Sequence, residues 1–350
     1  MLYPLTFHPI FKERVWGGRR LEQLYHKRLP PGIPIGESWE ISDRPGDASV
    51  IANGALAGKD LHWLMERQAA ELLGPAGSWR GRFPLLVKLL DSRETLSLQV
   101  HPPAAKAAAL GGEPKAELWY IAEAAPGAEL YVGLKRRVSR AEFERKLQAG
   151  SVAECFHRVA VRPGDAMFLP SGRVHALGAG LVVFEIQQNS DTTYRVFDWN
   201  RVGLDGKPRA LHVPQSLASI DFNDFEPALV RADFAGAGPA RVRPLVREPL
   251  FRVEAWQIQA AAQVPLGPGR MHILGVLNGQ LCVRAGQSEL ALAAGQCCLV
   301  PAGLPKVELR AETAASLLRA EAGACSGRHE GLPRRDGHLG IQGCVAMAVV

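Results

Sequence analysis

Polar and apolar residues alternate strictly over residues 95–101, TLSLQVH, before two prolines end the run. The polar parity holds Thr95, Ser97, Gln99 and His101. A period of two predicts a β-strand that places Gln99 and His101 side by side on one face, about 7 Å apart. A sheet with one solvated face gives the same pattern. The rest of the chain must therefore decide between a structural and a functional strand.

Three further segments predict strands that carry charges. Lys88 lies in FPLLVKLL and Glu185 in GLVVFEIQQ, while Lys115 and Glu117 share a parity in PKAELWYIAEA. A carboxylate within an apolar strand is costly unless it is paired or used. Lysines that alternate into a cavity suit a phosphate or an enolate oxygen, although a long lysine can also extend to solvent.

A repeated frame divides the chain. Gly164–His175 reads GDAMFLPSGRVH and Gly295–Lys306 reads GQCCLVPAGLPK, so glycine, proline and glycine recur at equal spacing, 131 residues apart. This exceeds the roughly 20 to 50 residues of solenoid repeats and predicts two similar domains. Each copy predicts a strand that ends at a proline turn. The frame resembles the second motif of the cupin superfamily, which implies a mainly β fold of two cupin (double-stranded β-helix jelly-roll) domains with a few inserted helices.

The two copies differ at their last position. His175 ends the first copy and is a metal-ligand type, whereas Lys306 ends the second, and a protonated amine is a poor ligand. The first domain is therefore expected to hold a metal and the second is not. His272, in the second domain, has no partners in the sequence and is interpreted as a hydrogen-bonded histidine outside the site.

The first domain offers four candidate ligands: Gln99, His101, Glu117 and His175. Two imidazoles, a carboxylate and an amide oxygen suit Zn²⁺ and leave room for water or substrate. Two histidines and one carboxylate equally suit the Fe²⁺ of an oxygenase. The ligand types alone leave the chemistry open.

Arg195 lies in SDTTYRVFDWNR, close in sequence to Asp191 and Asp198. Its charge can serve the cavity, or it can form a structural ion pair with one of these aspartates.

Two helices are predicted within the strand pattern. SRAEFERKLQAG begins with a capping box, Ser139 and Glu142, and ends on a glycine. This helix either covers part of the barrel mouth or packs on an outer sheet face. DLHWLMERQAAELLG, residues 60–74, begins with Asp60 as its N-cap.

Composition excludes several function classes. The net charge of +6 over 350 residues is scattered, without the basic stripe that nucleic-acid binding needs. No apolar run indicates a signal peptide or a membrane span, so the protein is expected to be cytoplasmic. Six cysteines without a C-x-x-C pair predict reduced thiols.

Several segments together resemble the type I mannose-6-phosphate isomerases (phosphomannose isomerases) in their short bacterial form. They are FPLLVKLLDSRETLSLQVHPP, KAELWYI, GDAMFLPSGRVHALG and VFEIQQNSDTTYRVFDW, with VWGG and IGESWEIS near the N-terminus. The resemblance spans about residues 1 to 322 and implies three sets of site residues. The implied zinc ligands are Gln99, His101, Glu117 and His175; the phosphate-binding residues are Lys88 and Ser97; the catalytic residues are Lys115, Glu185 and Arg195.

The resemblance also implies domains and a reaction. Residues 1–235 would form the catalytic, metal-binding cupin domain with helical insertions, and 236–322 a companion cupin domain without metal ligands. Residues 323–350 depart from the family pattern and have no clear period, so they are expected to form a flexible C-terminal extension. The expected activity is zinc-dependent interconversion of mannose 6-phosphate and fructose 6-phosphate through an enediolate, with one Zn²⁺ per chain.

Within this reaction, Glu185 is the first choice of base and Lys115 its rival, while Arg195 faces the developing charge. A metal-dependent cupin dioxygenase and a non-catalytic sugar-phosphate-binding cupin are the alternatives. The expected partner is a small phosphosugar, with no nucleic acid or membrane. The oligomeric state stays open and is compatible with a monomer.

Overall fold

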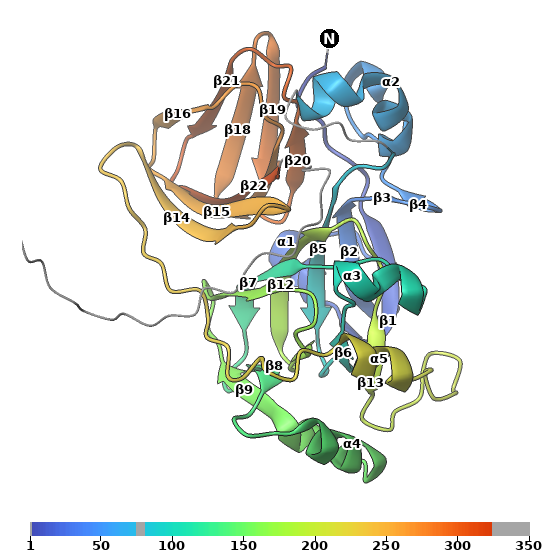
Figure 1. Cartoon of the computed structure of the whole chain (residues 1–350). Helices are drawn as coiled ribbons and strands as arrows, with labels where there is room; N and C mark the ends of the chain where they lie inside the picture. The colour runs from blue at the N-terminus through green and yellow to red at the C-terminus, as the bar shows by residue number, and fades with distance from the viewer. Residues whose placement is uncertain (1, 75–80, 324–350) are drawn as a thin grey trace, which may run out of the picture.

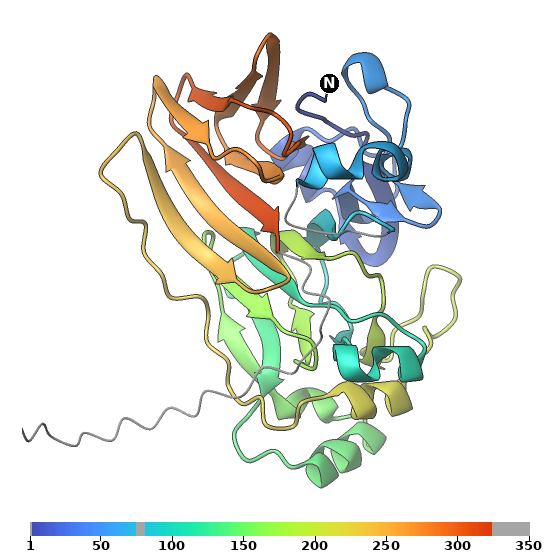
Figure 2. The same ribbon diagram turned by 45° about the horizontal axis from the view of Figure 1, so that its top comes forward.

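The computed structural model of the chain describes residues 2–74 and 81–323, and consists mainly of antiparallel strands (Figures 1 and 2). One pair of facing sheets uses strands that end by residue 197, and a second pair uses strands that begin at residue 240. The predicted fold class, mainly β with two double-sheet cupin domains and few helices, is confirmed. The predicted domain boundary near residue 235 stays a prediction, which this division of the strands supports.

The first pair contains a six-stranded and a five-stranded sheet. The six-stranded sheet has the order β1 (Ile10–Gly18), β2 (Ile35–Ile41), β5 (Leu85–Ser92), β12 (Leu181–Gln188), β7 (Glu117–Ala124) and β10 (Ala166–Leu169). The five-stranded sheet has the order β13 (Tyr194–Phe197), β6 (Leu98–Val100), β11 (His175–Leu177), β8 (Glu129–Leu134) and β9 (Phe156–Ala160). β3 (Asp43–Arg44) and β4 (Asp47–Ala48) form a short hairpin beside them.

The second pair repeats this plan with fewer strands. One sheet has the order β14 (Ala240–Arg247), β15 (Phe251–Ile258), β22 (Ala315–Ala322), β17 (His272–Asn278) and β20 (Cys297–Val300). The other has the order β16 (Ala262–Leu266), β21 (Val307–Ala311), β18 (Gln280–Ala285) and β19 (Ser288–Ala293).

The helices are short and lie outside the sheets (Figure 1). The α-helices are α1 (Arg20–Tyr25), α2 (Leu61–Leu73), α3 (Ala104–Ala107), α4 (Arg140–Gln148) and α5 (Val213–Ser219), and 3₁₀ turns occupy Gly54–Leu56, Ala108–Leu110 and Val152–Cys155. Among the described residues, none of these helices has the length and apolar character that crossing a membrane requires.

The six-stranded sheet is buried on both faces, which explains its nearly continuous apolar runs. Along β5, Leu85, Val87 and Leu89 pack toward the second pair of sheets, whereas Leu90 packs inside the first barrel. On the companion side this shared core includes Phe251. The two pairs of sheets are therefore joined by one apolar cluster.

Both copies of the repeated frame have the predicted structure. Each begins with a glycine of positive φ, 93° at Gly164 and 78° at Gly295. β10 and β11 flank the first proline turn, and β20 and β21 flank the second.

The strand predicted over residues 95–101 is shorter than expected, because only Leu98–Val100 pairs as a strand. The carbonyl oxygens of the two residues Thr95 and Leu96 accept hydrogen bonds from side chains instead. Arg201 donates to Thr95, and the Trp199 indole N–H donates to Leu96. The predicted alternation of side chains holds over residues 97–100 but fails at Leu96, which lines the cavity together with Ser97. Ser97 and Gln99 face the interior of the barrel, and Leu98 and Val100 face the outer core.

The two predicted helices are confirmed. The Asp60 side chain caps α2 by accepting from the Trp63 N–H at 2.7 Å, and Ser139 caps α4 by accepting from the Glu142 N–H at 3.1 Å. On α4, Phe143 belongs to the apolar cluster on the outer face of the five-stranded sheet. The outer-face alternative for this helix is therefore correct, and the barrel-mouth alternative is wrong.

Two further predictions concern cysteines and the C-terminus. The cysteines within the described residues, Cys155, Cys282, Cys297 and Cys298, are free thiols, as predicted. The predicted extension, residues 323–350, lies outside the described residues except for Gly323.

Replacing Gly295 with alanine should destabilise the protein. A Cβ at this position would lie 2.3 Å from the Tyr25 ring, and the φ of 78° disfavours side chains. We expect the free energy of unfolding to fall by about 2 kcal/mol or more, measured by urea denaturation. Gly267→Ala is the matched control, because a Cβ there meets no atom within 4 Å. Equal stability of the two variants would contradict the tight packing of Tyr25 on Gly295.

Candidate active site

Three buried ligand-type side chains converge inside the first barrel. His101 follows β6, Glu117 begins β7 and His175 begins β11, and their ligand atoms all lie within 4.8 Å of one another. Gln99 is paired directly with His175 across β6 and β11, and its Nε2 lies 3.3 Å from His175 Nε2. The four predicted ligands therefore meet at one point.

Backbone carbonyls fix the tautomers of both histidines. His101 Nδ1 lies 2.8 Å from the Thr192 oxygen, and His175 Nδ1 lies 2.9 Å from the Arg173 oxygen. A carbonyl only accepts, so each Nδ1 carries the proton and each Nε2 keeps its lone pair. Both lone-pair nitrogens face Glu117, at 3.5 Å from Oε2 for His101 and 3.2 Å from Oε1 for His175. Proteins orient metal-binding histidines in this way.

The cluster has unsatisfied polar atoms that a cation would satisfy. His101 Nε2 and both Glu117 carboxylate oxygens are buried without a hydrogen bond, although the Lys115 ammonium lies 2.7 Å from Glu117 Oε2. Each such atom costs about 1–3 kcal/mol if it stays unpaired. Rotating the Gln99 amide by 180° would turn its oxygen toward the same point. The residues present therefore fit a divalent metal ion.

Electrostatics keep these side chains in the state that metal binding needs. Burial and the nearby Lys115 charge lower the pKa of His101 to about 3. Burial alone would raise the pKa of Glu117, but Lys115 and His101 outweigh it and hold this pKa well below the ordinary range. Near neutral pH the imidazole is neutral and the carboxylate is ionised, as ligands must be.

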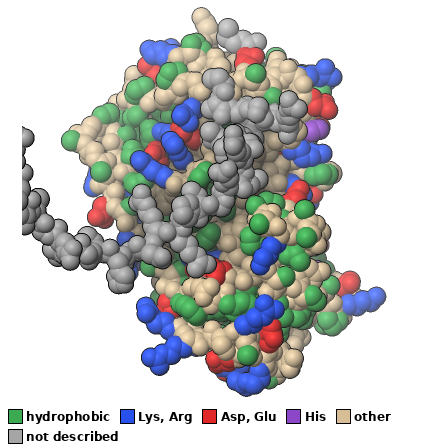
Figure 3. All heavy atoms as spheres, in the orientation of Figure 1, with side chains coloured by type: hydrophobic (Ala, Val, Ile, Leu, Met, Phe, Trp, Pro, Cys, Tyr) green, Lys and Arg blue, Asp and Glu red, His purple; other side chains and the backbone are tan. Residues whose placement is uncertain are grey.

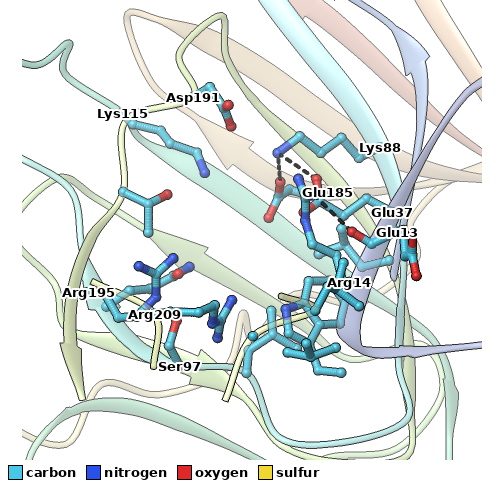
Figure 4. A pocket seen from close by; sticks show the side chains of 18 of the residues that line it. Glu13, Arg14, Glu37, Lys88, Ser97, Lys115, Glu185, Asp191, Arg195 and Arg209 are labelled. Carbon is cyan, nitrogen blue, oxygen red and sulfur yellow. Dashed lines mark hydrogen bonds and ion pairs between the residues drawn. The ribbon is translucent and has the colours of Figure 1, made fainter. Parts of the chain in front are cut away.

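A cavity of about 560 Å³ opens beside this cluster (Figure 4). Strands of both sheets and the loop over residues 199–211 contribute to its wall. Its polar lining includes Arg14, Glu37, Lys88, Ser97, Gln99, Lys115, Glu185, Asp191, Arg195 and Arg209. All predicted site residues either line the cavity or belong to the cluster of His101, Glu117 and His175 beside it.

Glu185 and Lys88 form an ion pair on the cavity wall. They lie opposite each other on β12 and β5, with Lys88 Nζ 3.0 Å from Glu185 Oε1. The Trp119 indole N–H donates to the other carboxylate oxygen at 2.8 Å. The buried carboxylate within this apolar strand is therefore paired, as its cost requires.

Arg195 does not form the ion pair that the sequence left open. Asp198 binds Arg201 and Arg209 instead, at 2.9 and 2.5 Å. The Arg195 guanidinium donates to the Ala210 carbonyl at 2.7 Å, and burial followed by the charge of Arg209 lowers its pKa. Among the described residues no carboxylate lies within ion-pair distance of Arg195. The structural ion-pair alternative is wrong, and this positive charge remains available to the cavity.

Sequence reasoning missed five charged residues of the cavity wall: Glu13, Arg14, Glu37, Asp205 and Arg209. Glu37 lies in the segment IGESWEIS, where its shared parity with Trp39 was the available indication. Arg14 and Arg209 lie in segments without a period that would orient their side chains.

The companion barrel has a different interior. His272 pairs with Val300 as Glu117 pairs with Leu169, so it occupies the corresponding place in the repeated frame. Its Nδ1 lies 3.3 Å from Glu321 and its Nε2 lies 3.0 Å from the Gly267 oxygen. The interpretation of His272 as a hydrogen-bonded histidine is confirmed.

An ion pair of reversed polarity also lies in the companion barrel. Glu254 on β15 faces Arg319 on β22 at 3.4 Å, whereas Lys88 on β5 faces Glu185 on β12 in the first barrel. Lys306 is exposed beside Glu308. Within the part of the chain that the structure describes, His101, Glu117 and His175 form the one group of this kind that could hold a metal ion.

Comparisons with known proteins identify the family. A family model described as "Phosphomannose isomerase type I, catalytic domain" matches residues 5–116. A mannose-6-phosphate isomerase of Streptococcus mutans is 34% identical over 302 residues, which are 86% of this chain and 93% of that protein. The chain belongs to the type I mannose-6-phosphate isomerases. The predicted enzyme class, an aldose–ketose isomerase, is thereby confirmed.

Solved structures of mannose-6-phosphate isomerases share the fold. The enzyme from Bacillus subtilis superposes with a TM-score of 0.82 at 30% identity, over 91% of this chain and 99% of that chain. A more distant structure, described as a mannose 6-phosphate isomerase bound with zinc and yttrium, has a TM-score of 0.71 at 19% identity and covers 92% of this chain and all of its own. This second likeness concerns the fold alone.

The His101→Ala variant should lose metal because it removes one of three converging ligands. We expect about one equivalent of divalent metal in the wild-type protein. The metal affinity of the variant should fall by about 10-fold or more, so the variant should lose most of its metal. Elemental analysis after dialysis measures this. His272→Ala is the matched control, since it removes a buried histidine of the companion barrel. Equal metal content in the two variants would place the metal elsewhere.

Proposed function

We propose that the protein interconverts mannose 6-phosphate and fructose 6-phosphate through an enediolate, with one Zn²⁺ held by the four predicted ligands. Those ligands are Gln99, His101, Glu117 and His175. The observation that carries this proposal is the buried His–Glu–His cluster beside a cavity of acidic and basic groups, in a chain of the isomerase family. When bound, Zn²⁺ would supply Lewis-acid polarisation of the sugar oxygens.

The alternatives receive less support. A cupin dioxygenase would place iron on the same donors, but the family relationship is to isomerases. A non-catalytic sugar-phosphate-binding protein would not need a buried carboxylate and an unpaired guanidinium facing the same cavity, and Glu185 and Arg195 supply both. The donor set itself does not favour zinc over iron.

Proton transfer between carbon 1 and carbon 2 of the open-chain sugar requires a base in the cavity. Glu185 stays the first choice, because its carboxylate is oriented by Trp119 and Lys88 and lines the cavity. Each carboxylate oxygen has a further lone pair that can accept a proton. Lys115, the rival, is engaged with Glu117 at 2.7 Å, which directs its charge to the ligand cluster.

Arg195 is proposed to stabilise the enediolate oxygen. Its backbone is paired with that of Gln99 across β13 and β6, so its side chain starts beside one of the proposed metal ligands. A fixed donor at the point where negative charge develops lowers the barrier more than it tightens substrate binding.

The phosphate end of the substrate is proposed to lie at Ser97. In Figure 4, Ser97, Arg195 and Arg209 lie together at one side of the cavity, away from Lys88. A dianion belongs where positive charge is in excess. Lys88 is implied by the resemblance to bind phosphate as well; this assignment stays a prediction, and its ammonium already faces Glu185 and Glu37.

Incubating the purified protein with mannose 6-phosphate should form fructose 6-phosphate, because the cavity holds the base and the charge-stabilising groups that isomerisation needs. A coupled dehydrogenase assay or NMR would follow the product. A chelator should abolish the activity and added Zn²⁺ should restore it. Absence of product with metal-loaded protein would refute the isomerase proposal, and oxygen consumption would favour the dioxygenase.

Replacing Arg195 with alanine should lower kcat by roughly 100- to 1000-fold, as removal of an oxyanion donor does. KM should change much less, because the interaction forms mainly in the transition state. Metal content should stay intact. Arg201→Ala is the matched control, since Arg201 binds Asp198 and does not line the cavity. Near-normal turnover of Arg195→Ala with its metal retained would move this role to Lys115.

A further inference from the structure

Four charged side chains form a chain across consecutive strands of the six-stranded sheet. Arg14 on β1 lies 2.7 Å from Glu37 on β2, Glu37 lies 3.8 Å from Lys88 on β5, and Lys88 lies 3.0 Å from Glu185 on β12. The dashed lines of Figure 4 follow this chain along the cavity wall. Positive and negative groups alternate along it, and it ends on the carboxylate proposed as the base.

Burial makes each member of this chain depend on the next. Glu37, Lys88 and Glu185 are exposed by only 9%, 4% and 4%, and a buried ion costs several kcal/mol unless it is compensated. One ammonium between two carboxylates leaves a net charge of −1, which Arg14 neutralises. Removing Glu37 would leave Lys88 with Glu185 as its one close carboxylate partner.

Glu37 is itself held rigidly. Its Oε1 accepts from Arg14 and its Oε2 accepts from the Trp39 indole N–H, each at 2.7 Å. The Lys88 ammonium also lies 5.1 Å from the centre of the Trp39 ring. Glu37 and Trp39 therefore form a fixed wall on the side of Lys88 opposite to Glu185.

We propose that Glu37 is a positioning residue of the isomerase, which acts through Lys88 by holding its ammonium as a fixed positive charge on the cavity wall. Arg14 in turn holds Glu37. The consequence for turnover rests on the proposed function, whereas the consequence for the chemistry of Lys88 does not.

The titration of these groups agrees with the geometry. Burial favours the neutral amine of Lys88, but Glu185, Glu37 and then Asp191 outweigh it and raise its pKa above the ordinary value. Burial would likewise raise the pKa of Glu37, and the charges of Lys88 and Arg14 instead lower it to about 2. Removing the Glu37 charge must lower the pKa of Lys88. A larger fraction of the amine is then neutral at a given alkaline pH.

The first test measures the amine directly, by competitive labelling with acetic anhydride and peptide mass spectrometry between pH 8 and 10. Labelling of Lys88 is compared with that of exposed Lys306 in the full-length protein. In Glu37→Gln we expect Lys88 to react about 10-fold faster than in the wild type, which corresponds to one pKa unit. Unchanged labelling of Lys88 would overturn the proposal.

Glu40→Gln is the matched control. Glu40 lies on the same strand, is equally buried and binds Lys27 at 2.7 Å, but does not line the cavity. This variant should leave the labelling of Lys88 as in the wild type. Lys115, elsewhere on the cavity wall, reports on general opening of the cavity. Equal acceleration at Lys115 and Lys88 in Glu37→Gln would indicate local unfolding and would also overturn the proposal.

The second test asks whether Glu37 acts through Lys88 in turnover. Glu37→Gln alone should lower kcat about 10-fold and leave KM within about threefold. In the Lys88→Gln background the same substitution should lower kcat by less than about twofold, because coupled residues are not additive. Full additivity would overturn the proposal. If the wild-type protein does not isomerise mannose 6-phosphate, the proposed function fails and the labelling result still decides the role of Glu37.

Discussion

Burial of the six-stranded sheet on both faces is the constraint on which the rest of the structure depends. One face packs into the apolar cluster shared with the companion sheets, and the other forms the cavity wall. Strands enclosed in this way leave their side chains little freedom. Lys88 and Glu185 thus project from fixed positions, and the companion domain contributes to the site without supplying a ligand to it.

Charge compensation then varies along the cavity. Near β2 and β5 each buried ion has an opposite partner, as Glu37 and Lys88 show. Beside the ligand cluster, Glu117 has Lys115 at one oxygen and two imidazole lone pairs facing it, which leaves room for a cation. At Arg195 the positive charge lacks a carboxylate partner among the described residues. The cavity therefore has uncompensated charge where a metal and an oxyanion are proposed to bind.

The sequence predicted the parts of the site that follow a local rule. Gln99, His101 and Glu117 lie on or beside strands whose period of two fixes which side chains share a face, and His175 follows a repeated turn. The strand predicted over residues 95–101 was too long. At its start the side chains of Trp199 and Arg201, about a hundred residues away, donate to backbone carbonyls that would otherwise pair with a neighbouring strand.

What the sequence could not predict arises from contacts between distant strands. The chain from Arg14 to Glu185 exists because β1, β2, β5 and β12 are neighbours in the sheet, although they are separated along the chain. The same holds for Arg195, whose guanidinium donates to the Ala210 carbonyl and pairs with neither Asp191 nor Asp198. Asp198 is instead bound by Arg201, three residues further along the chain, and by Arg209, from the loop that follows β13.

The reversed ion pair of the companion barrel has a consequence for how these two domains relate. If both descend from one duplicated gene, the second copy has been released from chemistry and kept as a scaffold, with Glu254 and Arg319 filling the place of the reactive wall. Replacing Lys306 with a histidine would not rebuild an active site there. His272 occupies the place of Glu117, and Glu254 and Arg319 carry charges opposite to those of Lys88 and Glu185. An engineered site would therefore need all of these residues replaced together.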